Sequence, residues 1–117
     1  MAIFNLNHAI TGLLIRTISG DSFSRAVENE VAAGRTLANA DLRLLGRNGD
    51  PQMLNLKGAV MTNAVMDDAV IVGSDLSNAD LSNASLKRTD QRNTIQRKVT
   101  VTGLTETGSR TDGRDGR

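Results

Sequence analysis

A large apolar residue recurs every five positions through the middle of this 117-residue chain. Seven centres keep one unbroken register: Leu56, Met61, Met66, Ile71, Leu76, Leu81 and Leu86. A period of five matches neither the 3.6-residue turn of an α-helix nor the alternation of a β-strand. A small residue stands two positions before six of the seven centres, and Ser, Asn, Asp or Gly often follows. A short extended piece ending in a tight turn cannot bury its own apolar side chain, so such units must stack on one another.

The repeat resembles the pentapeptide-repeat family, whose unit is approximately A-(D/N)-L-x-x. ADLSN at 79–83 and ADLRL at 40–44 match this unit fully, while SDLSN, ASLKR and LNLKG show one or two departures. AVMTN, AVMDD and AVIVG carry valine at the second position. The resemblance covers residues 35–90, about half of the chain, and adds Leu37 and Leu42 as two earlier centres.

The resemblance implies a mainly β fold, a right-handed quadrilateral β-helix in which four units make one coil. Coils would stack about 4.8 Å apart, as strands do in a sheet. At four units per coil, three apolar pairs stack: Leu76 on Leu56, Leu81 on Met61, and Leu86 on Met66. The fourth stack puts the polar Gln91 after Ile71, so we expect the solenoid to end near Asp90, after about two and a half coils.

Three segments are expected. Residues 1–34 hold a β-hairpin and a capping helix at about 23–33, because Asp21 or Ser22 can cap its start and Gly34 suits its end. Residues 35–91 form the β-helix, with an irregular loop at 45–53, so that Leu37 falls one position short of a full coil before Leu56. Residues 92–117 give a strand-like segment at 94–104 and a flexible basic tail.

No motif in the sequence indicates catalysis, so we expect no enzyme, no cofactor and no metal site. The single histidine, His8, has no partner from which to build a triad or a metal site. Asp67 and Asp68 fall at a repeat corner and are expected to face solvent. The chain has no cysteine and no apolar run near the roughly 20 residues that cross a bilayer, so we expect no membrane contact. We expect a cytoplasmic protein of a bacterial cell or a phage.

We expect a non-catalytic structural or protein–protein interaction module whose protein partner is unidentified. The alternative is a DNA mimic that modulates DNA gyrase or a topoisomerase, which is what a resemblance to the quinolone-resistance pentapeptide proteins implies. Mimicry requires negative charge, because duplex DNA carries about one charge per 1.7 Å. Residues 35–90 carry six basic and seven acidic side chains, which favours the interaction module.

The last coil is expected to be an interface. A solenoid end presents unpaired N–H and C=O groups above an apolar layer, so we expect a homo-oligomer, a dimer through the C-terminal coil. The resemblance implies the same, and the other possibility is a monomer on which residues 94–104 fold back as a lid. Nucleic acid is expected to bind only weakly, through Arg110, Arg114 and Arg117 of the tail.

Overall fold

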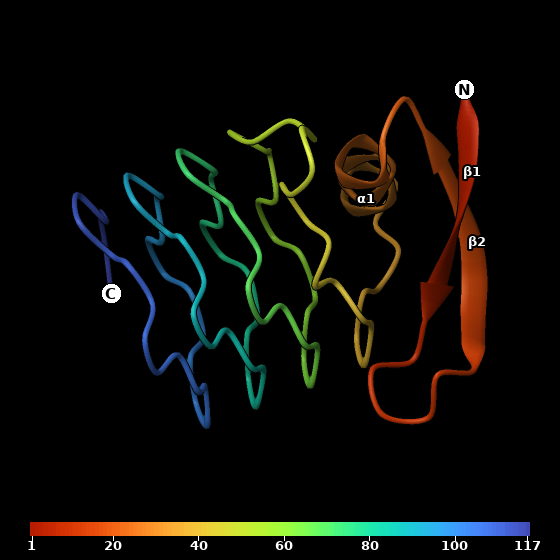
Figure 1. The fold of residues 1–117 in the computed structure, drawn as a ribbon. Helices are drawn as coiled ribbons and strands as arrows, with labels where there is room; N and C mark the ends of the chain where they lie inside the picture. Colours follow the sequence, from red (N-terminus) through yellow and green to blue (C-terminus); the bar gives the residue numbers. More distant parts are fainter.

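The computed structural model describes residues 1–117, with a hairpin and a helix at one end of a stack of coils (Figure 1). Strand β1 (Ala2–Asn7) pairs antiparallel with β2 (Leu14–Gly20). Helix α1 (Phe23–Ala32) follows, and the Ser22 Oγ caps it by accepting the Arg25 N–H at 3.1 Å. The C-terminus lies at the far end of the stack from the hairpin. No helix is long and apolar enough to cross a membrane.

Parallel bridges between residues four units apart join successive coils from Asn55 to Asp115. Each coil has four bridges, one in each unit. At each bridge the backbone pairs in both directions. The Leu76 N–H donates to the Ile95 carbonyl at 2.7 Å, and the Ile95 N–H donates to the Ser74 carbonyl at 3.0 Å. The chain is therefore a β-helix, in which main-chain groups are satisfied between coils.

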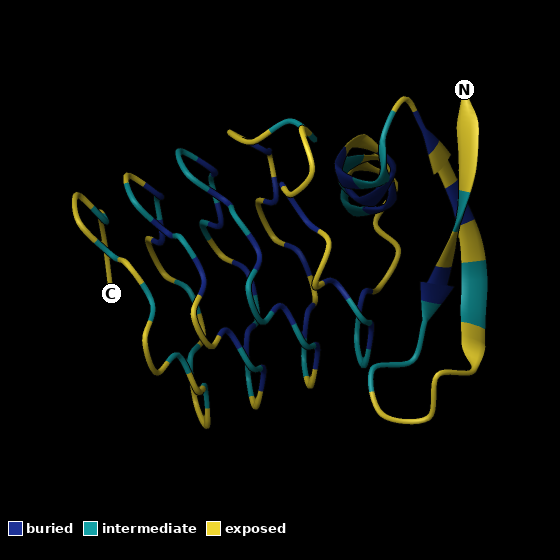
Figure 2. Cartoon of the chain, viewed as in Figure 1, coloured by how far each residue is buried: buried dark blue, intermediate teal, exposed yellow.

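Buried residues recur along the coils (Figure 2), and most of those between Leu37 and Leu86 are apolar. All nine repeat centres are fully buried: Leu37, Leu42, Leu56, Met61, Met66, Ile71, Leu76, Leu81 and Leu86. The alanines two positions before a centre are at most 3% exposed, and they belong to the same core cluster. The alternation of a small and a large residue in the sequence is therefore the alternation of two inward positions in each unit.

The polar positions of the repeat stabilise its turns. Where the residue before a centre is Asp or Asn, its side-chain oxygen caps the turn, as where Asp75 Oδ1 accepts the Ser77 N–H at 2.9 Å. The second residue after every centre position from Leu56 to Thr111 has a left-handed backbone, with φ between 57° and 76°. This is the third position of a type II turn, which favours Gly and Asn. Nine of these twelve corners are Gly or Asn.

Lys98 is one of the three exceptions and is strained at φ 59°. A left-handed conformation costs an L-residue about 1–2 kcal/mol, which glycine would avoid. Glycine also loses more conformational entropy on folding, and this offsets part of the stabilisation. We expect Lys98→Gly to raise the free energy of unfolding by about 0.5–1 kcal/mol in urea titrations. Lys87→Gly, where φ is not positive, is the matched control and is expected to lower it by a similar amount. A destabilised Lys98→Gly protein would contradict this turn.

The expectation for residues 92–117 is wrong. There is no strand at 94–104, and the segment continues the coil path, with bridges from Asp75 to Ile95 and from Ile95 to Asp115. One column of bridged residues runs through Asp41, Val65, Ser85 and Thr105, so there are four levels of coil instead of about two and a half. The stack does not end at Gln91, because the polar side chains of the last coil satisfy one another.

The first coil also differs from the expected register. The Leu37 N–H donates to the Val60 carbonyl at 2.8 Å, which places Leu37 beside Met61. The register expected from the sequence had placed Leu37 on Leu56. Leu42 is displaced in the same way, because its N–H donates to the Val65 carbonyl. The loop after the first two units is therefore longer than one coil requires.

Helix α1 lies against this loop and the second coil. Glu28 Oε2 accepts the Asn55 N–H at 2.6 Å. The Ser24 Oγ donates to Asp50 Oδ2 at 3.1 Å and accepts the Gly46 N–H at 2.8 Å. The longer loop thus runs past the helix and is hydrogen-bonded to it, which is why the first coil leaves the regular period of four units.

Candidate functional site

The side chains that could carry chemistry are dispersed. His8 lies in the hairpin turn, where its Nδ1 accepts the N–H groups of Ile10 and Thr11 at 3.2 and 3.3 Å. Asp67 and Asp68 lie at a coil corner, and each accepts hydrogen bonds from the next coil. No three His, Asp or Glu side chains lie close enough together to hold a metal ion. The surfaces of the coil stack, and its two ends above all, are therefore the candidate sites.

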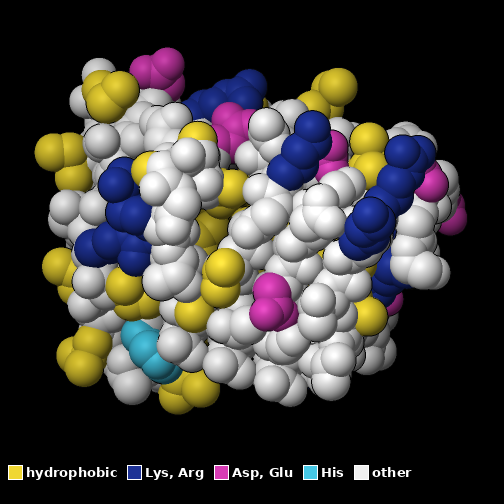
Figure 3. Space-filling view, turned by 180° about the vertical axis from the view of Figure 1, so that it is seen from behind, with side chains coloured by type: hydrophobic (Ala, Val, Ile, Leu, Met, Phe, Trp, Pro, Cys, Tyr) yellow, Lys and Arg dark blue, Asp and Glu magenta, His cyan; other side chains and the backbone are white.

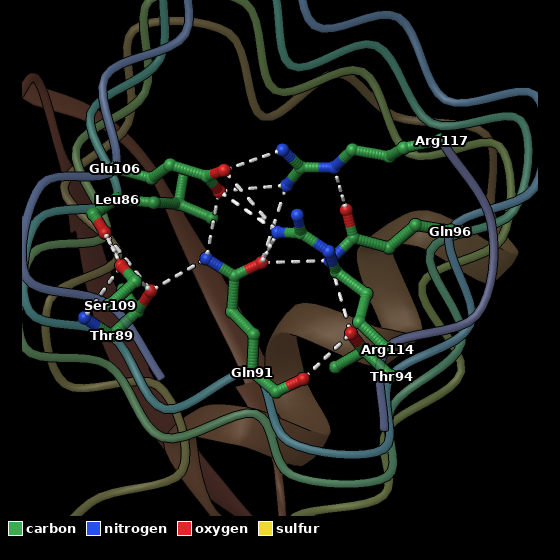
Figure 4. Close-up of polar contacts among 9 residues, drawn as sticks. All are labelled: Leu86, Thr89, Gln91, Thr94, Gln96, Glu106, Ser109, Arg114 and Arg117. Atoms are coloured by element: carbon green, nitrogen blue, oxygen red, sulfur yellow. Dashed lines mark hydrogen bonds and ion pairs between the residues drawn. The ribbon is translucent and has the colours of Figure 1, made fainter. Parts of the chain in front are cut away.

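The interior becomes polar toward the C-terminal end (Figure 4). Gln91 and Gln96 are fully buried, at the positions that Ile71 and Leu76 occupy one coil earlier. The Gln91 Nε2 donates to Glu106 Oε2 at 3.2 Å, and the Gln96 Nε2 donates to Gln91 Oε1 at 2.8 Å. The four-unit register had placed Gln91 after Ile71 as the expected end of the solenoid, and sequence reasoning missed Gln96, which the same register places after Leu76.

Two arginines near the C-terminus reach over this polar layer. The Arg114 Nη1 donates to Glu106 Oε2 at 3.2 Å, and the Arg117 Nη1 donates to Glu106 Oε1 at 2.8 Å. The Arg117 Nε also donates to Gln96 Oε1 at 2.5 Å, and its side chain is only 13% exposed. We call the five side chains of Gln91, Gln96, Glu106, Arg114 and Arg117 the polar plug. No buried side-chain nitrogen or oxygen in the chain lacks a partner, so the plug closes this end without an apolar layer.

A buried carboxylate holds the lid at the opposite end. Glu30 of α1 is 4% exposed and accepts the Arg16 Nε at 2.6 Å and the Arg35 Nε at 2.9 Å. The Arg16 Nη2 also donates to the Thr36 carbonyl at 2.5 Å. One acidic group therefore joins β2, the helix and the start of the first coil.

Both ends hold a carboxyl group with a lowered pKa. The hydrogen bond from Arg35, together with Arg16, holds the pKa of Glu30 below its ordinary value of 4.5, against the opposing effect of burial. Burial raises the pKa of Glu106, but Arg117, Gln91 and Arg114 together lower it overall. In both places the folded protein favours the ionised form.

Acid is therefore expected to destabilise both ends. A group whose folded pKa is lowered contributes stability that is present above its unfolded pKa and is lost as the pH falls through the folded pKa. The free energy of unfolding should fall as the pH drops below about 4.5. We expect a shallower fall for Glu30→Gln and for Glu106→Gln, measured by urea titration between about pH 7 and pH 3. A profile as steep as the parent's in both variants would contradict these ion pairs.

The last coil ends in an unpaired backbone edge. In earlier coils the N–H of each centre, and of the residue two after it, donates to the next coil, as Leu76 does to Ile95. The equivalent N–H groups of the last coil have no acceptor within the chain: Val101, Gly103, Glu106, Gly108, Thr111 and Gly113. The carbonyls that would accept from a further coil are also free: Val99, Leu104, Ser109 and Arg114. This edge is the most extended set of unsatisfied main-chain groups that the coils present.

The sides of the stack carry charges of both signs in ion pairs. Two of these pairs join neighbouring coils: the Lys57 Nζ lies 3.6 Å from Asp75 Oδ2, and the Arg88 Nε lies 2.9 Å from Asp68 Oδ1. Figure 3 shows basic and acidic side chains next to each other on one side, beside a broad uncharged area. The side shown in Figure 3 therefore carries no continuous stripe of one charge.

Comparison with known proteins identifies the repeat. Residues 54–90 match, in eight copies, the family model for pentapeptide repeats, as the resemblance predicted. No curated protein is significantly similar to the sequence.

Two solved structures that match the chain come from cyanobacteria. One is HetL, a pentapeptide repeat protein from Nostoc involved in heterocyst differentiation regulation, at 21% identity and a TM-score of 0.35 over 69% of this chain and 44% of that one. The other is a pentapeptide repeat protein from Cyanothece, at 20% identity and a TM-score of 0.28 over 71% of this chain and 61% of that one. The chain thus spans less than two thirds of either protein.

Proposed function

We propose that this chain, whose residues 54–90 belong to the pentapeptide-repeat family, is a non-catalytic structural or protein–protein interaction module. The observation that carries the proposal is the unpaired backbone edge of the last coil, because such an edge is a template for pairing with another chain. We also infer a right-handed, four-sided coil path. Four bridges per coil and the usual hand of parallel crossovers support it.

The partner that we propose for this edge is a second copy of the chain, in a dimer through the C-terminal coil. A two-fold axis would bring the same edge of both copies together. Glu106 pairs with Arg114 and Arg117 of its own copy, so its carboxylate needs no partner from the second copy, and the plug keeps one net positive charge. The proposal places the protein in the cytoplasm of a bacterial cell or among phage-encoded proteins, and the absence of cysteine is consistent with a reducing compartment.

Proline substitution at the edge tests the proposal. Thr111→Pro removes one free N–H per copy, and a two-fold dimer then loses two hydrogen bonds of about 1 kcal/mol each. We expect the dimer dissociation constant, from light scattering over a concentration series, to rise about tenfold or more. Thr107→Pro is the matched control, since it occupies the second position of a type II turn, which accepts proline.

Two results would overturn the proposal. One is an association state, measured over the concentration series, that is the same for the Thr111→Pro chain as for the parent. The other is potent inhibition of DNA gyrase supercoiling by the parent chain, relieved by Asp67→Asn and Asp68→Asn. That result would replace the interaction module by the DNA-mimic alternative, for which the paired charges on the sides of the stack offer little support.

A further inference from the structure

The N-terminal hairpin leaves an unusual number of large aliphatic side chains in solvent. Five of them are between 56% and 89% exposed, and we call them the hairpin stripe: Met1, Ile3, Ile10, Leu13 and Leu14. Figure 3 shows hydrophobic side chains along the edge of the molecule that the hairpin forms, at the left of that view. Exposed apolar groups that gather on one element mark an interaction surface more often than scattered ones do.

The stripe is free of charged side chains. Residues 1–15 contain no Asp, Glu, Lys or Arg, and the first charged side chain, Arg16, pairs with the buried Glu30. A two-fold interface brings a surface against its own copy, so a charged surface repels itself, whereas an uncharged apolar one is complementary to itself. The chemistry of this surface therefore fits a second copy of the chain.

The backbone of β1 offers a second feature that fits this occupant. The sheet has only two strands, and no backbone group of residues 2–6 is hydrogen-bonded outside the hairpin. On β2, by contrast, the Asn29 Nδ2 of α1 donates to the Ser19 carbonyl at 3.0 Å. The outer edge of β1 is thus open to antiparallel pairing with the same strand of another copy.

The available area is sufficient for a small, specific dimer. Burying one aliphatic side chain contributes about 1.5–3 kcal/mol at about 25 cal/mol per Å², which corresponds to about 100 Å² of apolar surface for each side chain. The stripes of two copies would together remove about 1,000 Å² from water, which is the lower limit expected of a stable interface.

We propose that the hairpin stripe and the open edge of β1 form a two-fold interface with a second copy of this chain. This interface lies at the opposite end of the stack from the C-terminal edge and does not depend on it. With only one of the two interfaces, the chain forms a closed dimer; with both, copies alternate head to head and tail to tail in a linear assembly.

The test uses a chain that carries Thr111→Pro, so that pairing through the last coil is weakened and the hairpin contributes most of the association. Light scattering at about 100 µM should show a dimer, since weak specific contacts are populated there. Adding Ile10→Lys and Leu13→Lys should raise the dissociation constant at least tenfold. Because both side chains are exposed, the two substitutions should leave the melting curve unchanged. Met53→Lys, at a side chain that is 75% exposed and lies beside Gly73 of the coils, is the matched control and should leave the dimer intact. A monomer, or a dimer that ignores the two lysines, overturns the proposal.

Spin labels can locate the interface because the chain has no cysteine of its own. In the same background, labels at Asn5→Cys on β1 should lie closer together than labels at Asp112→Cys in the last coil. The longest extent of one chain is 33 Å, so the two arrangements differ clearly. The reverse order of distances overturns the proposal. Flotation with phosphatidylcholine vesicles, lost on Ile10→Lys and Leu13→Lys, would overturn it too and assign the stripe to a lipid surface.

Discussion

Leu81→Asp is expected to abolish cooperative unfolding. The Leu81 side chain is fully buried, in a column with Met61 of the preceding coil and Val101 of the following one. An aspartate there would lack both water and a cation, and an uncompensated buried charge costs several kcal/mol. That cost approaches the total stability of a small domain, about 5–15 kcal/mol. Circular dichroism during heating should show a broad transition or none.

Ser82→Asp is the matched control for this substitution. Ser82 is the next residue along the chain, and it is only partly buried at the turn. Its hydroxyl donates to Asp80 Oδ1 at 2.6 Å, so the replacement loses this hydrogen bond and places two carboxylates together, which should cost about 1–2 kcal/mol and still leave a cooperative transition. If Leu81→Asp melts like Ser82→Asp, then Leu81 does not point inward and the repeat register is wrong.

The register around Leu81 could be predicted because the signal is local and repeated. Each unit carries its own inward residue, its own turn cap and its own left-handed corner, so one reading of the pattern applies to every unit in the run. The start of helix α1 could also be predicted, because the N-cap Ser22 accepts a hydrogen bond from a backbone group only three residues away. These are short-range rules, and the sequence states them directly.

The polar plug could not be recognised in the same way. A lone Gln91 at an interior position indicates the end of an apolar core, because a buried amide without partners is costly. Its partner Glu106 lies 15 residues further along, and the Arg117 that covers both lies 26 residues from Gln91. Whether a buried polar group is tolerated depends on partners that come together only after the coils have stacked.

The predicted register of the irregular loop at 45–53 was wrong for a different reason. A stretch without the repeat can lengthen a coil or shorten it, and its own residues do not say which. The outcome is decided by contacts with the helix, where Ser24 joins Asp50 to Gly46. Ser24 belongs to the N-terminal lid, well before the loop in the chain, so the register of the first coil follows from the lid and not from the repeat.

Gly46→Ala tests that register, and it is expected to destabilise the protein more than any other glycine change in this loop. Gly46 has φ 71°, and a Cβ built on it would lie 1.6 Å from the Val70 carbonyl oxygen. That oxygen belongs to the backbone of the next coil, so it cannot move away without disturbing the pairing between coils. We expect a loss of about 3 kcal/mol or more in the free energy of unfolding, from the clash and the left-handed strain together.

Gly49→Ala is the matched control, because Gly49 lies in the same loop at φ 83° and its Cβ would meet nothing within 4 Å. Only the left-handed strain remains there, so urea titration should show a loss of about 1–2 kcal/mol. The difference between the two variants isolates the contact between Gly46 and Val70. A first coil in the register that places Leu37 on Leu56 would not bring these two residues together. Equal losses in the two variants would therefore mean that the first coil does not pack on the second through this contact.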